Sequence, residues 1–126
     1  MRVEKAKIFI GKVLRLLDVG RAEADVFFIT SAEMRRLNRA YRGKDKTTNV
    51  LSFESPIEFP RPDLDKKTRH LGEIYINPSY IKKHGESQEE MLTHGLLHLL
   101  GFNHEEKNDR INMHNLEKKI SSILGY

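Results

Sequence analysis

Residues 93–107 read THGLLHLLGFNHEEK and hold three of the six histidines in this 126-residue chain. His94 and His98 are four residues apart in an apolar run, which places both imidazoles on one face of a helix. Gly101 is a stop signal for that helix, so the chain can fold back and bring His104 to the same point. Neutral imidazole is a natural zinc ligand. The spacing therefore predicts a metal site formed by these three histidines.

Gly95 follows the first histidine, at the position where zincin-type peptidases carry a glutamate that shuttles protons. Glycine inside a helix costs about 1 kcal/mol relative to alanine, so Gly95 indicates a close approach by another backbone or by substrate. Three protein ligands leave the fourth tetrahedral position open, which is typical of a catalytic zinc, and such an ion lowers the pKa of its water to about 7. The motif predicts a hydrolytic metal site and disfavours a peptidase.

Two alternatives stay open for this motif. The histidines could lie in the core and bond to backbone carbonyls, because an unpaired buried imidazole is costly. The ion could also differ, since imidazole suits nickel, copper and iron as well as zinc. We expect one divalent ion per chain, zinc in the first place and nickel or another transition metal as the alternative.

Length and composition indicate one domain, which we expect to span residues 1–126. Apolar residues make up 38% and charged residues 32% of the chain, which is ordinary for a globular protein. The absence of cysteine excludes disulfides and thiolate metal sites. No apolar run approaches the roughly 20 residues of a membrane span, and no signal peptide opens the chain. We therefore expect a cytoplasmic protein that does not bind membranes.

The pattern of apolar residues predicts strands in the first two thirds of the chain and helices toward its end. The expected helices cover residues 5–18, 31–42, 78–84, 88–100 and 108–126, and the expected strands cover 25–30, 48–53 and 71–77. Residues 54–70 hold three prolines and read as a long loop, either a flap over substrate or a surface loop. This order predicts an α+β fold, with a small mixed sheet packed with helices and the metal site on a helix in the C-terminal half.

Helical spacing also predicts which residues form the core. On the histidine helix, we expect Leu92, Leu96 and Leu99 to face inward. The inward residues expected on the first and last helices are Ile8, Val13, Leu14, Leu16, Leu17, Ile111, Leu116, Ile120 and Leu124.

Residues 35–46, RRLNRAYRGKDK, carry six basic residues and one acidic residue, in a chain whose net charge is +4. Arginine near a helix C-terminus complements the helix dipole, which accounts for one of Arg39 and Arg42. A guanidinium beside a metal site would also hold a phosphodiester and stabilise charge on its oxygens. Tyr41 and Phe53 flank this turn and are candidates to stack on bases, with core packing as the alternative for Phe53.

Three segments together resemble the YbeY family of bacterial endoribonucleases, which act in ribosomal RNA maturation. These segments are LNRAYRGKDKTTNVLSF (37–53), LGEIYIN (71–77) and HGLLHLLGFNH (94–104). The resemblance covers about residues 23–125, nearly the whole chain.

The resemblance implies a small α+β domain whose zinc is held by the motif histidines, matching His94, His98 and His104, and a functional arginine matching Arg42. The implied activity is cleavage of single-stranded RNA, in 16S ribosomal RNA 3′-end processing and in ribosome quality control. Ribosomal RNA and the ribosome are the implied partners.

The chain departs from the family pattern at three places. Asn103 stands where the family usually has aspartate before the last histidine, which leaves proton transfer open, with Glu105 and Glu106 as candidate proton carriers. The usual glycine-aspartate opening of the third strand is Gly72-Glu73. We expect the N-terminal strand of the family to be absent or very short.

We therefore expect a zinc-dependent endoribonuclease specific for single strands, with Arg42, His94, His98 and His104 as its catalytic residues. One alternative is a metallopeptidase-like hydrolase, and another is a ribosome-assembly factor whose metal is mainly structural. The remaining histidines, His70, His84 and His114, are expected to be solvated or capping residues.

Overall fold

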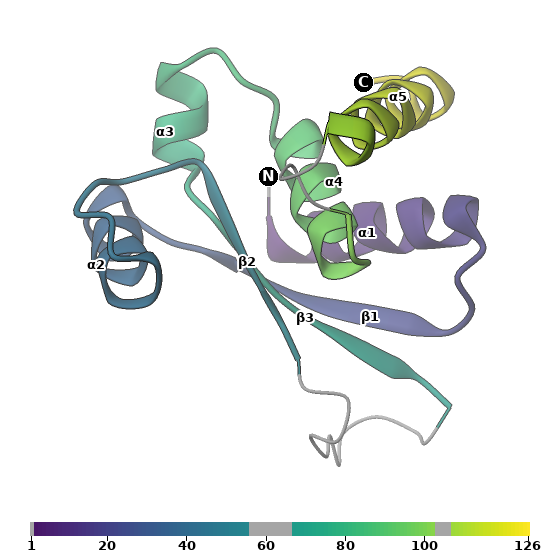
Figure 1. The fold of residues 1–126 in the computed structure, drawn as a ribbon, viewed down its shortest axis with the longest axis horizontal. Coiled ribbons are helices and arrows are strands. Elements are labelled where there is room, and N and C mark those ends of the chain that lie inside the picture. Colours follow the sequence, from purple (N-terminus) through teal and green to yellow (C-terminus); the bar gives the residue numbers. More distant parts are fainter. Residues whose placement is uncertain (1, 56–66, 103–106) are drawn as a thin grey trace.

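The computed structural model describes residues 2–55, 67–102 and 107–126. Within these ranges the chain forms five helices and three strands (Figure 1). Their bounds are α1 Val3–Leu17, β1 Ala22–Phe28, α2 Ser31–Arg42, β2 Val50–Glu54, β3 Arg69–Ile76, α3 Pro78–Lys83, α4 Gln88–Leu99 and α5 Lys107–Leu124. None of the helices formed by these residues has the length and apolar content needed to cross a membrane.

The three strands form one mixed sheet in the order β1-β3-β2. β1 runs parallel to β3, with Val26 opposite Ile74, and β2 runs antiparallel to β3, with Phe53 opposite Glu73. Figure 1 shows α1, α4 and α5 on one side of the sheet, with α2 at the end of the sheet where β1 leads into it. The predicted α+β fold with a small mixed sheet is confirmed.

The main core lies between the sheet and the helices α1 and α4. The three leucines expected on the histidine helix, Leu92, Leu96 and Leu99, are buried there against Ile74 and other strand residues. The buried residues that form this core cluster are Ala6, Ile10, Val13, Leu14, Ala24, Val26, Leu71, Ile74, Ile76, Ile81, Leu92, Leu96, Leu97, Leu99, Met113 and Ile120.

Three residues predicted for the core are on the surface instead. Ile8 and Leu16 of α1 are 60% and 39% exposed, and Ile111 of α5 is 47% exposed. On α1 the buried stripe runs through Ala6 and Ile10, because the side chains that share a helix face are three or four residues apart. Ile8 lies between those two positions and therefore points away from the sheet.

Strand boundaries differ from the expected ones by one to three residues. β1 spans 22–28 rather than 25–30, and β2 begins at Val50 rather than at residue 48. β3 begins at Arg69, two residues inside the predicted loop, because it pairs there with Ala22 of β1. Residues 56–66 lie outside the described part of the chain, so the expected flap stays a prediction.

Gly72 lets β2 lie close to β3. Its φ is 147°, a backbone conformation that other residues rarely adopt. A Cβ atom at this position would lie 2.1 Å from the carbonyl oxygen of Phe53 and 3.0 Å from the Cα atom of Glu54. Any side chain at position 72 would therefore push the edge strand away.

We expect Gly72→Ala to lower the free energy of unfolding by about 2 kcal/mol or more, because it adds backbone strain to a steric clash. Urea unfolding measures the difference. Gly11→Ala is the matched control, since Gly11 lies inside α1 with open space around its Cβ position. That change should raise stability by up to about 1 kcal/mol. Wild-type stability of Gly72→Ala would contradict the close strand approach.

Candidate active site

Helix α4 lies unusually close to the sheet at Gly95. A Cβ atom there would lie 3.1 Å from Cγ2 of Ile74 and 3.4 Å from Cγ2 of Val50. A close approach at Gly95 was expected from another backbone or from substrate, but among the described residues it is made by side chains of β2 and β3. It brings the histidine-bearing face of α4 over the edge strand.

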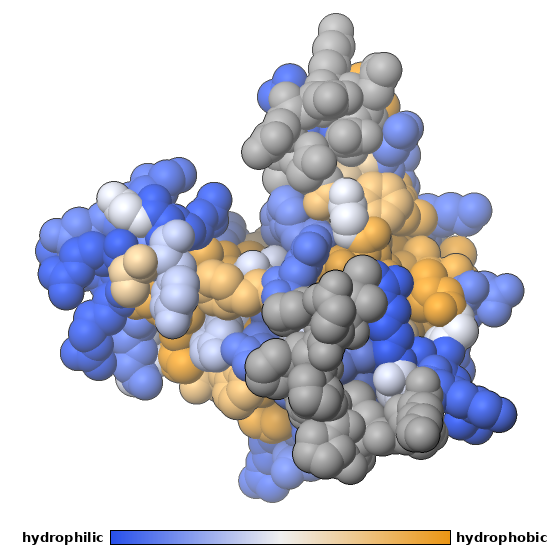
Figure 2. Space-filling view, turned by 60° about the horizontal axis from the view of Figure 1, so that its bottom comes forward, coloured by the Kyte–Doolittle hydropathy of each residue, from blue (hydrophilic) through white to orange (hydrophobic). Residues whose placement is uncertain are grey.

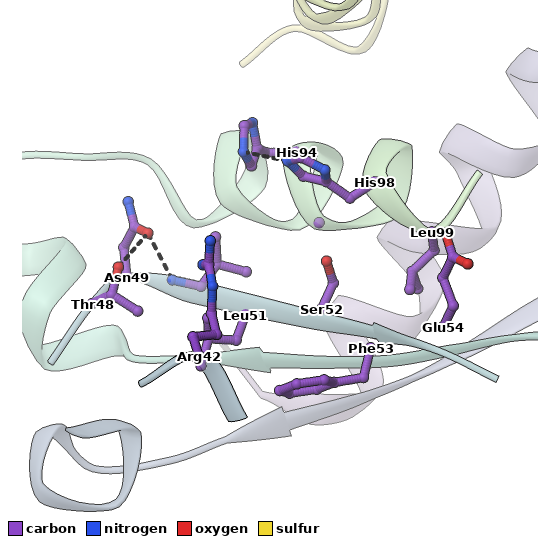
Figure 3. A pocket seen from close by; sticks show the side chains of 12 residues that line it. Arg42, Thr48, Asn49, Leu51, Ser52, Phe53, Glu54, His94, His98 and Leu99 are labelled. Carbon is purple, nitrogen blue, oxygen red and sulfur yellow. Dashed lines mark hydrogen bonds between the residues drawn. The ribbon is translucent and has the colours of Figure 1, made fainter. Parts of the chain in front are cut away.

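A cavity of about 570 Å³ lies between α4 and β2 (Figure 3). Arg42, from the end of α2, shares this cavity with His94 and His98 from α4. The complete lining is Arg42, Thr48, Asn49, Val50, Leu51, Ser52, Phe53, Glu54, His94, Gly95, His98 and Leu99. The structure thus brings together three of the four predicted catalytic residues, which come from two segments far apart in the sequence.

His94 and His98, the two motif histidines within the described residues, lie next to each other on the face of α4 that lines the cavity. Their Nε2 atoms are 3.1 Å apart, and their ring planes cross at 72°. Two nitrogens bound to one tetrahedral zinc at about 2.0–2.1 Å are about 3.3 Å apart. The separation of His94 and His98 is therefore close to that of two ligands of one ion.

Glu117 of α5 fixes the orientation of His94. Its Oε1 atom lies 3.3 Å from Nδ1 of His94, and both side chains are half-buried. A carboxylate accepts a hydrogen bond here, so we assign the proton of His94 to Nδ1. The Nε2 atom of His94 then points at His98 as an acceptor. A carboxylate behind the far nitrogen of a ligand histidine is a common arrangement in metal sites.

Glu117 was not foreseen from the sequence, because only the docking of α5 on α4 brings it to His94. The C-terminal residue Tyr126 contributes to that docking. Its hydroxyl lies 2.7 Å from Oγ1 of Thr93 on α4, and its ring packs edge-on against Phe9 of α1. Burial is the main cause that raises the pKa of the Tyr126 hydroxyl.

The third predicted ligand, His104, lies outside the described residues, as do Asn103, Glu105 and Glu106. Within residues 2–55, 67–102 and 107–126, no three His, Cys, Asp or Glu side chains come together to hold a metal ion. His94 and His98 are therefore placed as two of the three predicted metal ligands would be. The role of His104 stays a prediction.

The basic turn after α2 is held by two buried asparagines. Asn38 donates a hydrogen bond of 2.9 Å to the carbonyl oxygen of Lys46. Asn77, which caps α3, donates to Oγ1 of Thr47 and to the carbonyl oxygen of Thr48 at 3.1 and 3.2 Å. These bonds link the turn to α2 and α3, so the entry to β2 has a defined position beside the cavity.

One arginine of the basic segment is neutralised. Arg35 makes two hydrogen bonds to Asp45, of 2.9 and 3.2 Å, and these bonds lower the pKa of the Asp45 carboxyl. Both side chains are exposed, so the pair adds little to stability. The positive charge near the cavity therefore comes from the other basic residues of this segment.

Glu54 and Ser52 are lining residues that the sequence did not single out. Figure 3 shows Ser52 pointing from β2 toward α4 and Phe53 pointing to the other side of the strand. The Glu54 carboxylate can accept a proton, and the Arg42 guanidinium can hold an anion. Side chains of β2 alternate between the two faces of the sheet, and which of them face α4 depends on a strand register that the sequence leaves open.

The other histidines lie outside the cavity lining. His84 follows α3 as its C-cap residue and His114 is exposed, as expected. His70 was expected to be solvated or capping, but its side chain is 7% exposed. Its Nδ1 lies 2.6 Å from Oγ of Ser55 and its Nε2 lies 3.1 Å from Oδ2 of Asp25. Pairing with β1 buries it in this polar cluster.

Comparisons with known proteins identify the family to which the chain is similar. The sequence model of the family described as Endoribonuclease YbeY matches residues 3–125. A relative of that name from Ruthia magnifica subsp. Calyptogena magnifica is 34% identical over 124 residues, covering 92% of this chain and 82% of the relative. Another, from Chelativorans sp., is 41% identical over 113 residues, covering 83% of this chain and 68% of the relative.

The fold is similar to that of a Thermotoga maritima protein whose structure was determined in solution. The TM-score is 0.60 at 26% sequence identity, and the match covers 98% of this chain and 81% of that protein. A family match over nearly the whole chain, together with relatives above 30% identity at high coverage, establishes the relationship. The chain belongs to the YbeY endoribonuclease family.

Proposed function

We propose that this protein is a zinc-dependent endoribonuclease that cleaves single-stranded RNA. Its proposed substrate is ribosomal RNA, in 16S 3′-end maturation and in ribosome quality control, and its proposed catalytic residues are Arg42, His94, His98 and His104. The observation that carries the proposal is that Arg42 and the two described histidines line one cavity. Membership in an endoribonuclease family supports RNA as the substrate.

Each residue of the site has a proposed task. An ion held by His94, His98 and His104 would supply Lewis-acid polarisation of a phosphoryl oxygen. Glu117 keeps the proton of His94 on Nδ1 and thereby keeps Nε2 available as a ligand atom. Arg42 binds two oxygens of the phosphodiester with its guanidinium and stabilises the negative charge that builds up on them.

A peptidase is disfavoured at Gly95. Zincin-type peptidases need a glutamate after the first histidine. A Cβ atom at this position would lie 3.1 Å from the side chain of Ile74 and 3.4 Å from that of Val50, so a glutamate would require these side chains to move. A ribosome-assembly factor with a structural metal is the other alternative, and it would bind RNA without cleaving it.

We expect the purified protein to bind close to one zinc or similar ion per chain, measured by elemental analysis and chelator competition. His98→Ala should lose the ion. Glu117→Ala should weaken metal affinity by roughly 10- to 100-fold, because partners behind a ligand histidine contribute about that much. Glu117→Gln should weaken it less, since the amide oxygen still accepts from Nδ1.

The matched control for Glu117 is Glu90→Gln, which changes an exposed glutamate in the first turn of α4. It should leave metal affinity at the wild-type value. Full metal occupancy in a variant that lacks both His94 and His98 would disprove the assignment of the site.

We expect Arg42→Ala to lower the rate of RNA cleavage by two or more orders of magnitude, on the order of 3 kcal/mol. Fold and metal content should persist, because an arginine at a helix end contributes only about 0.3–1 kcal/mol to stability. Arg42→Lys should rescue poorly, since a point charge cannot make the forked contact. Single-turnover cleavage of a single-stranded RNA measures the effect.

Arg39→Ala is the control for Arg42. Arg39 lies nearly one turn earlier on α2 and is absent from the cavity lining, so its removal should matter much less. Wild-type cleavage by metal-loaded Arg42→Ala would show that Arg42 only complements the helix dipole.

A further inference from the structure

Four aromatic rings form a continuous row from α2 across all three strands. Tyr41 of α2 packs edge-on against Phe53 of β2, with ring centroids 5.3 Å apart. Phe53 packs edge-on against Tyr75 of β3 at 5.7 Å, and Tyr75 stacks on Phe27 of β1 at 5.0 Å. Since Val50 and Ile74 face α4, strand alternation places the three strand rings on the opposite face of the sheet.

The two ends of this row are exposed to different degrees. Tyr41 is 70% exposed, although its ring is held by Phe53, whereas Phe27 at the other end is 41% exposed. Phe53 and Tyr75 between them are half-buried. Core packing therefore accounts for the inner rings, but the ring of Tyr41 presents most of its surface to solvent.

Carboxylates lie beside the inner rings of the row. The hydroxyl of Tyr75 donates a hydrogen bond of 2.6 Å to Glu73, which is the cross-strand partner of Phe53, and Asp25 of β1 affects the same hydroxyl. Burial and these carboxylates raise the pKa of Tyr75 to about 12. A polyanion would be repelled from this part of the row.

The segment that carries Tyr41 is rich in basic residues. It contains five further basic residues, Arg36, Arg39, Arg42, Lys44 and Lys46. Its one acidic residue, Asp45, is hydrogen-bonded to Arg35. Figure 2 shows hydrophilic residues over the α2 region at the left of the view, with hydrophobic residues beside them toward the sheet. An exposed ring among cations suits a ligand that has both aromatic faces and phosphates.

Tyr41 is also close to the proposed catalytic arginine. It directly precedes Arg42, so their Cα atoms are about 3.8 Å apart. Its packing partner Phe53 belongs to β2, the strand that lines the cavity, although the Phe53 ring points to the other side of that strand. A phosphate bound by Arg42 would bring the base of a neighbouring nucleotide within reach of the Tyr41 ring.

We propose that Tyr41, held in place by Phe53, stacks on one base of the single-stranded RNA next to the phosphate that Arg42 binds. This inference rests on the proposed nuclease function. It supplies a physical source for single-strand specificity, because bases in a duplex are stacked on each other and do not offer a face to a protein ring.

The test is equilibrium binding of a fluorescent single-stranded oligoribonucleotide to the full chain in the presence of chelator, which prevents metal-dependent cleavage. Tyr41→Ala and Tyr41→Leu should weaken binding by roughly 5- to 150-fold, and Tyr41→Trp should bind like the wild type. Leucine keeps apolar surface but has no ring, so it separates stacking from burial. The slope of affinity against salt should stay unchanged, since no phosphate contact is lost.

The matched control is Phe27→Ala, which removes an exposed ring from the end of the same row that lies farthest from Tyr41, and it should leave RNA affinity unchanged. Oligonucleotides with single abasic sites give a second readout. One abasic position should weaken binding to the wild type by the same factor as Tyr41→Ala. It should have no further effect on Tyr41→Ala, because both changes remove the same contact.

Wild-type affinity in Tyr41→Ala, or in Tyr41→Leu, would overturn the stacking proposal while leaving the nuclease function intact. In that case Tyr41 would be free to serve a protein partner instead. Failure of the wild-type protein to bind any single-stranded RNA, both with chelator and with its metal restored, would refute the proposed function itself, and the stacking site with it.

Discussion

The close packing of α4 on the edge of the sheet is the constraint on which the site depends. It exists because position 95 carries no side chain, so that Ile74 and Val50 reach the helix at van der Waals distance. The same approach sets His94 and His98 above β2 and thereby makes one wall of the cavity. Gly72 of β3 has a similar role, because its missing side chain lets the edge strand β2 lie against β3.

Buried asparagine side chains then hold the turn beside the site in place. Asn77 caps α3 and bonds to the turn that leads into β2, and Asn38 bonds to the same turn from α2. Leaving such groups without partners would cost about 1–3 kcal/mol each, so the turn is well defined. In the same way, the Glu117 carboxylate fixes the orientation of the His94 ring.

The two faces of strand β2 serve different parts of the molecule: one faces the cavity and α4, and the other carries a ring of the aromatic row. Ser52 points toward α4, whereas Phe53 points to the opposite side and joins the aromatic row (Figure 3). Arg42 and Tyr41, adjacent at the end of α2, lie in the cavity lining and at the end of that row respectively. One short edge strand therefore connects the cavity with the surface on which we place base stacking.

The sequence by itself determined the α+β class, the number and order of the described elements, and the pairing of His94 with His98, because all of these follow from local spacing along one chain. It also indicated Arg42, through a resemblance that covers most of the chain. It misplaced Ile8, Leu16 and Ile111, since helical spacing alone does not say which of two apolar stripes meets the sheet.

Only the tertiary structure decided the contacts between distant segments. Glu117 meets His94 because α5 docks on α4, and Glu54 reaches the cavity because of the register between β2 and β3. His70 is buried because β1 pairs with β3 beside Asp25. Such partners carry no local signal in the sequence: their distance in space depends on how whole elements pack, and a one-residue change of register would turn each strand side chain to the other face.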